Sequence, residues 1–156
     1  MKYYFKQRFF SWLDSYDIYN EDNETEFTVE GVFSLGHCLH VYDRNKEHIG
    51  TIKEELFRLL PHFQIFYKDN YLGEIVKEFS FFKPSFTMDF NGWHVDGDWT
   101  EWEYTIKDEY GNLIATISKD IWNFTDVYWI DIVDDDDAFD VLMVVLAIDA
   151  EKCSRS

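Results

Sequence analysis

Apolar and polar residues alternate along most of the chain, and the alternation recurs in units. Three segments, residues 50–67, 73–90 and 115–132, align without gaps. Each ends in five alternating residues, as in Phe63-x-Ile65-x-Tyr67. A two-residue period places apolar side chains on one face of a strand. Each unit is therefore expected to form a strand, a tight turn and a second strand.

Residues 9–19 and 32–42 match the later part of the unit, and a sixth, weaker copy covers residues 95–108. Turn-forming residues such as Asn91-Gly92 separate the units. The six units share one apolar anchor position in the second strand, occupied by Tyr16, Leu39, Phe63, Phe86, Tyr104 and Tyr128. Six hairpins joined by short connections predict about twelve strands in an antiparallel, up-and-down sheet.

The pattern changes near the C-terminus, where every residue from Val141 to Ile148 is apolar. A helix with this composition offers no polar face to water and has to be surrounded. The acidic run Asp134–Asp137 fits a helix start, because Asp caps helix N-termini and negative charge is favourable there. Asp140 and Asp149 are expected near the two ends of the helix, where a surrounding structure would be open to water. A further strand is the alternative, since the run contains β-branched residues.

These patterns predict how the elements assemble. About twelve twisted strands rarely stay as an open sheet, and closure removes the exposed edges. The apolar helix is about 20 Å long, shorter than the roughly 30 Å core of a bilayer, and it can fill the barrel interior. We predict a mainly β single domain over residues 1–156. It is a closed antiparallel barrel of about twelve strands (six hairpins) within 1–133, around a central hydrophobic helix at about 137–150.

Charge and cysteine content narrow the possible partners. The chain has 14 Lys and Arg against 31 Asp and Glu, a net charge of −17. Nucleic acid and anionic membranes would be repelled, so neither is expected as a partner. Cys38 and Cys153 do not make a disulfide framework, and the N-terminus lacks the apolar core of a signal peptide. A cytoplasmic protein with reduced thiols is expected.

The chain is similar to a known family at three places. These are the start YFKQRFFSWLDSYDIYNEDN, the recurring I-x-K-[E/D] units and the ending IDIVDDDDAFDVLMVVLAIDA. They resemble the LURP-one-related proteins, which belong with the tubby C-terminal domain and the phospholipid scramblases in one superfamily. The resemblance implies a twelve-stranded barrel around a C-terminal helix and a lipid or protein ligand. It also points to an acidic segment before the last helix, which in scramblases is associated with Ca²⁺.

The candidate metal ligands are Asp131, Asp134 and Asp136, because Ca²⁺ prefers carboxylate oxygens. The segment lacks the spacing of an EF-hand loop, and consecutive Asp residues at a helix start cannot all converge on one ion. Helix capping and solvation are the alternative role. A metal site at Cys38 and His40 is not expected, because no second Cys/His pair is nearby.

Two pairs of acidic residues at strand spacing are Asp96 with Asp98 and Glu101 with Glu103. Paired carboxylates can act as acid and base, and they can equally form a solvated outer face. The sequence contains no nucleophile elbow, P-loop or dinucleotide fingerprint. No catalytic residue, cofactor-binding residue or cofactor is expected.

Five tryptophans, Trp93, Trp99, Trp102, Trp122 and Trp129, stand out among the aromatic residues. At alternating positions they are expected to pack inside a barrel. Trp93, Trp99 and Trp102 belong to the least regular unit, and we expect these three to be exposed.

The expected function is that of a non-enzymatic binding or scaffold protein with an unknown ligand. The alternative is a scramblase-like protein that associates with membrane phospholipid, with or without Ca²⁺. A small hydrolase that uses Asp96 and Asp98 is the third interpretation.

Overall fold

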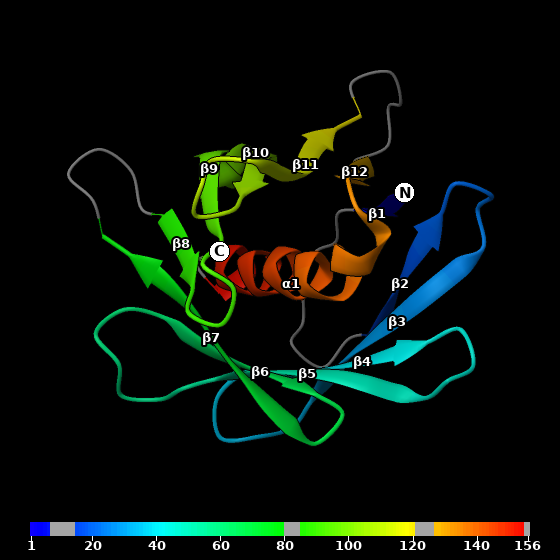
Figure 1. The fold of residues 1–156 in the computed structure, drawn as a ribbon. Helices are drawn as coiled ribbons and strands as arrows, with labels where there is room; N and C mark the ends of the chain where they lie inside the picture. The colour runs from blue at the N-terminus through cyan, green and yellow to red at the C-terminus, as the bar shows by residue number, and fades with distance from the viewer. Residues whose placement is uncertain (7–14, 80–84, 121–126, 155–156) are drawn as a thin grey trace.

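The computed structural model describes residues 1–6, 15–79, 85–120 and 127–154. Twelve strands form one closed barrel around a helix, α1 (Figure 1). The strands are β1 (Lys2–Lys6), β2 (Ser15–Asn20), β3 (Thr25–Val32), β4 (Cys38–Asp43), β5 (His48–Glu54), β6 (His62–Tyr67), β7 (Asn70–Glu78), β8 (Ser85–Met88), β9 (His94–Asp98), β10 (Glu103–Lys107), β11 (Leu113–Lys119) and β12 (Val127–Ile132).

Each strand pairs antiparallel with its neighbours in the chain, and β1 closes the barrel against β12. In this closing pair Tyr4 lies opposite Trp129. The predicted closed, twelve-stranded antiparallel barrel is confirmed. The six anchor residues of the repeat all lie in the second strand of a unit and are all buried: Tyr16, Leu39, Phe63, Phe86, Tyr104 and Tyr128.

The connections differ between the two ends of the barrel. The tight turns lie between repeat units, as at residues 44–47 and 68–69, and we call that end the turn end. Within a unit the connection is longer, as at residues 33–37 and 55–61, and we call the opposite end the loop end. Turns were expected both inside the units and between them. The structure places the tight turns at the junctions, where the predicted Asn, Asp and Gly residues cluster, and longer connections inside the units.

Helix α1 (Ala138–Ser154) runs through the barrel from the turn end to the loop end. Near its start, the ring of Phe139 lies 5.1 Å from that of Tyr67. Near its other end, the Nζ atom of Lys152 lies 4.9 Å from the ring centre of Trp102. All residues from Val141 to Ile148 are buried, as expected for a helix inside a barrel. Among the described residues, the structure has no helix with the length and apolarity needed to cross a bilayer.

The start of the helix lies close to the predicted position, and its end lies further on, at Ser154 instead of about 150. A short 3-10 helix, η2 (Asp135–Asp137), leads into it. The carboxylate of Asp134 accepts a hydrogen bond from the backbone N–H of Asp136 at 3.0 Å. The acidic run therefore contains the cap that the sequence indicated.

Two expectations about exposure are wrong. Asp149 is buried at the loop end, where its carboxylate accepts a hydrogen bond from the Tyr16 hydroxyl at 3.1 Å. Trp93, Trp99 and Trp102 are all buried as well. The interior of a closed twelve-stranded barrel is wide, and large aromatic rings help to fill it around the helix. Trp122 lies outside the described residues.

Candidate functional site

Apolar side chains stand in solvent at the loop end. Five of them are at least 80% exposed: Phe33, Leu35, Phe57, Leu59 and Phe79. Leu56, 44% exposed, lies among them, and we call these six residues the apolar rim. Elsewhere in the described chain, only Tyr110 at the turn end is a large hydrophobic residue that exposed. Exposed apolar residues that gather in one place mark interaction surfaces.

Backbone and side-chain contacts join the neighbouring segments that carry the described rim residues. A Cβ atom added to Gly36 would lie only 3.0 Å from the Leu56 side chain, so the first two connections are in contact. The carbonyl oxygen of His37 accepts a hydrogen bond from the Glu54 N–H at 2.8 Å. The carbonyl oxygen of Pro61 accepts one from the Lys77 N–H at 3.0 Å. The rim is thus one surface supported by neighbouring strands.

Phe57 is the most unusual residue of the rim. Its backbone has a φ of 65°, in the left-handed region that disfavours residues with a Cβ atom. Its side chain is completely exposed, so burial does not compensate for this conformation. Strained, exposed residues of this kind concentrate at functional sites.

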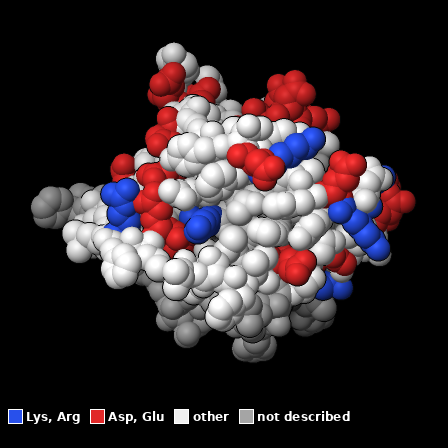
Figure 2. Space-filling view, turned by 90° about the horizontal axis from the view of Figure 1, so that it is seen from below, with Lys and Arg blue, Asp and Glu red and all other residues white. Residues whose placement is uncertain are grey.

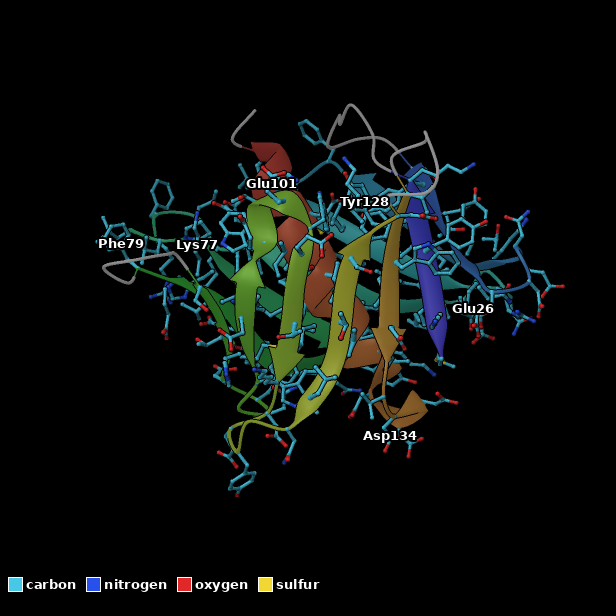
Figure 3. All side chains as sticks on the ribbon, turned by 90° about the horizontal axis from the view of Figure 1, so that it is seen from above. Glu26, Lys77, Phe79, Glu101, Tyr128 and Asp134 are labelled. Atoms are coloured by element: carbon cyan, nitrogen blue, oxygen red, sulfur yellow. The ribbon has the colours of Figure 1, made fainter. Side chains whose placement is uncertain are left out.

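Charged groups are buried directly inside the loop end, where α1 finishes. The Nζ atom of Lys77 lies 2.6 Å from the Glu151 carboxylate, and both side chains are almost inaccessible to solvent. The same ammonium lies 5.1 Å from the ring centre of Trp99. Burial raises the pKa of Glu151 to about 7; the nearby Glu54 carboxylate adds to the rise and His37 opposes it. This pair ties the end of the helix to the barrel wall beside Phe79 (Figure 3).

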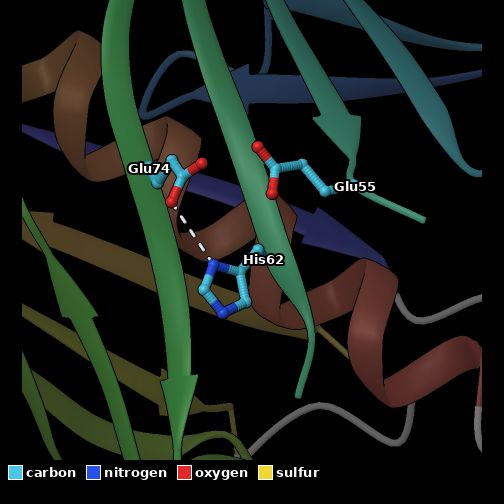
Figure 4. Close-up of side chains that lie close together, drawn as sticks. All are labelled: Glu55, His62 and Glu74. Atoms are coloured by element: carbon cyan, nitrogen blue, oxygen red, sulfur yellow. Dashed lines mark hydrogen bonds and ion pairs between the residues drawn. The ribbon is translucent and has the colours of Figure 1, made fainter. Parts of the chain in front are cut away.

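A cluster of three potential metal ligands lies on the outer surface at the base of the 55–61 connection (Figure 4). One ligand atom each of Glu55, His62 and Glu74 lies within 4.8 Å of the other two. His62 lies opposite Val76 in the β6–β7 ladder and Gln64 lies opposite Glu74, so His62 and Glu74 are diagonal neighbours on one face. A hydrogen bond in which the protonated Glu74 carboxyl group donates to the Glu55 carboxylate raises the pKa of Glu74, and burial adds to the rise.

The residues predicted to bind Ca²⁺ are placed separately. Asp131 lies on β12, 3.9 Å from the Nζ atom of Lys2, while Asp134 caps η2. Asp136 contributes its backbone N–H to that cap. Within the described ranges, the one group of three ligand-type side chains is the Glu55 cluster, so Ca²⁺ binding at these three residues remains a prediction.

The other predicted residues have local partners. Asp96 lies 3.3 Å from the Lys107 ammonium, and Asp98 accepts hydrogen bonds from Thr100. Asp96 and Glu103 line a shallow depression of about 440 Å³ on the outer surface.

On the other side of the barrel, Cys38 is buried, and His40 stacks on His48 with ring centres 4.3 Å apart. Leu39 and Val41 point to the core, as the alternation along this strand predicts.

Two features were missed from the sequence. Leu56 and Phe79 occupy the same position of the repeat, shortly after the first strand of the unit, and this was the available signal for the rim. The Glu55, His62 and Glu74 cluster gave no signal, because only the strand register brings these residues together.

The surface charge is distributed unevenly. Seen from below, Asp and Glu lie along the upper edge and on both flanks, with Lys and Arg among them, and described residues without charge fill much of the area between them (Figure 2).

Comparison with known proteins identifies the family. A family model described as LURP-one-related matches residues 1–149. A Bacillus subtilis (strain 168) protein, named uncharacterized protein YxjI, is 30% identical over 147 residues, covering 94% of this chain and 90% of that protein. No solved structure matches. The chain belongs to the LURP-one-related family.

Proposed function

We propose that this chain is a non-enzymatic binding protein whose apolar rim contacts the surface of a neutral phospholipid bilayer. The observation that carries the proposal is the exposure of the rim, where five large apolar side chains stand in water on neighbouring connections. Removing a side chain of this size from water is worth about 1.5–3 kcal/mol. Shallow insertion of several such side chains is enough for measurable binding.

The distribution of charge favours a neutral lipid. With a net charge of −17, the chain is repelled by anionic surfaces. The one described Arg in the 55–61 connection, Arg58, is engaged by the Glu55 carboxylate at 2.6 Å. Among its described residues, the rim therefore offers no cluster of free cations to an anionic head group, while its Phe and Leu tips suit the apolar region just below zwitterionic head groups.

The way the tips are presented also favours a lipid over a folded protein partner. Phe57 and Leu59 are completely exposed, so they project from the molecule and do not line a preformed pocket. A fluid bilayer adapts to separate projecting side chains, whereas a protein partner needs a complementary pocket for each. The resemblance to scramblases and tubby domains supports a lipid as well.

Flotation of the purified protein with phosphatidylcholine vesicles tests the proposal. Wild-type protein is expected to float, and the variant Phe57→Glu/Leu59→Glu is expected to lose at least about tenfold in binding. The matched control is Tyr110→Glu, which places a charge at an equally exposed aromatic position at the turn end and is expected to bind as wild type.

Wild-type protein that stays with the soluble fraction would overturn the lipid assignment and point to a protein partner. The same experiment with Ca²⁺ or a chelator addresses the scramblase-like alternative. We expect equal flotation of the wild-type protein with Ca²⁺ and with the chelator. Binding that rises with Ca²⁺ in wild type and not in Asp134→Asn would favour the Ca²⁺-dependent alternative instead.

A further inference from the structure

We propose that Glu55, His62 and Glu74 form a binding site for a divalent transition-metal ion such as Zn²⁺. Glu55 directly follows β5, His62 is the first residue of β6 and Glu74 lies in the middle of β7. The inference goes beyond the proposed lipid binding and does not depend on it.

The geometry suits a small ion. Zn²⁺ binds imidazole nitrogen and carboxylate oxygen at about 2.0–2.2 Å in a tetrahedron, which places ligand atoms about 3.3 Å apart. The Nδ1 atom of His62 already lies 3.3 Å from the Oε2 atom of Glu74. The third ligand atom, from Glu55, lies within 4.8 Å of both. Rotation about the flexible side-chain bonds of Glu55 can close the remaining gap, and water supplies the fourth position.

The surroundings orient the ligands as in known metal sites. The Oε2 atom of Glu55 accepts a hydrogen bond from Arg58 at 2.6 Å, and its Oε1 atom accepts one from Gln64 at 2.7 Å. Hydrogen bonds of this kind fix the direction of ligating carboxylates and leave further lone pairs free. All three ligand side chains are only about one fifth exposed, so water screens their charges less than at an open surface.

The mixture of ligands decides the class of ion. One imidazole with two carboxylates suits Zn²⁺ and related transition metals, whereas Ca²⁺ takes six to eight oxygen ligands. A divalent cation also removes the repulsion between the closely placed Glu55 and Glu74 carboxylates. By contrast, His37 contacts Glu54 at 2.5 Å, and no third ligand-type atom of the described residues lies within 4.8 Å of both, so that pair serves as a matched comparison.

The position of the site gives it a structural consequence. Glu55 and His62 stand on either side of residues 56–61, and the Glu55 N–H donates to the His62 carbonyl oxygen at 2.9 Å. An ion bound by both side chains would link the two ends of this connection in addition to this hydrogen bond. Metal binding is therefore expected to restrict the part of the rim formed by Leu56, Phe57 and Leu59.

Isothermal titration of chelator-treated protein with ZnCl₂ tests the inference. Wild-type protein is expected to bind one equivalent in the micromolar range, more tightly than it binds Ca²⁺. His62→Ala and Glu74→Gln are each expected to weaken binding by more than about tenfold. The controls His37→Ala and His48→Ala change the other His pairs and are expected to keep wild-type affinity.

Hydrogen exchange provides an independent readout. Zn²⁺ is expected to slow amide exchange within residues 56–61 in wild type and not in Glu74→Gln, a conservative change on the outer surface. Zn²⁺ affinity that is unchanged in His62→Ala and Glu74→Gln, or equally lost in a control variant, would overturn the inference. The absence of micromolar binding by wild type would do the same.

Discussion

At the turn end of the barrel polar side chains close the turns, whereas at the loop end apolar side chains stand in solvent above buried charges. Asp43 shows the first pattern: its carboxylate accepts hydrogen bonds from the N–H groups of Asn45 and Glu47 at 2.9 and 3.0 Å. Lys77 and Glu151 show the second, as an ion pair removed from water.

At the turn end polar side chains face water and bond to the backbone of the turns, as is usual in a stable fold. The loop end departs from two general rules, because apolar Phe and Leu side chains are exposed and charged groups are buried. Proteins break such rules mainly at functional sites. We therefore expect binding to involve the loop end and not the turn end, and three substitutions test how stability and binding are divided between the two ends.

The largest effect is expected from Lys77→Met. It removes the Lys77 ammonium from the buried Glu151 carboxylate, which should lower the free energy of unfolding by about 3–5 kcal/mol near pH 8. Burial raises the pKa of Glu151 to about 7 in the folded protein, above its ordinary value. This group therefore favours folding at low pH, and that contribution is lost as the pH rises to about 7. Without Lys77 the pKa rises further, so the deficit should shrink as the pH falls to about 5, where Glu151 binds a proton.

Urea denaturation at the two pH values measures this change. The double variant Lys77→Met/Glu151→Leu is the control and should recover most of the loss, because an apolar pair of similar size replaces the buried ion pair. An equal loss at both pH values would show that Lys77 acts through packing and not through charge.

A smaller effect is expected at the turn end from Asp43→Ala. The substitution removes two hydrogen bonds to backbone N–H groups, and a net loss of about 1 kcal/mol should follow. Vesicle binding should not change. Reduced flotation of this variant would break the division between the two ends.

The smallest effect on stability is expected from Phe57→Gly. Phe57 adopts a left-handed backbone conformation, which costs about 1–2 kcal/mol for a residue with a Cβ atom and which glycine adopts without this cost. Glycine also makes the unfolded chain more flexible, and ordering it on folding costs about 0.5–1 kcal/mol more. The free energy of unfolding should therefore rise by about 0.5 kcal/mol, while vesicle binding falls. A loss of more than about 1 kcal/mol in urea denaturation would mean that the Phe57 side chain packs against the fold.

The same contrast explains what the sequence could predict. The anchors from Tyr16 to Tyr128 located the strands because they are buried residues with a two-residue period. The apolar run from Val141 to Ile148 located the helix, because such a helix is stable only inside the barrel.

The features of the loop end were harder to predict from the sequence. Hydrophobicity alone does not distinguish a buried Trp99 from an exposed Phe57, because both interrupt the alternation at connections. The cluster of Glu55, His62 and Glu74 depends on cross-strand register, including the irregularity between Ile65 and Phe66, which the residue pattern does not specify.

Hydrogen–deuterium exchange of the wild-type protein, with and without phosphatidylcholine vesicles, tests the central claim most directly. If the apolar rim is the binding surface, vesicles should slow amide exchange at residues 33–37 and 55–61 and leave the turn at 108–112 unchanged. Protection of the 108–112 turn, or identical exchange with and without vesicles, would contradict the account.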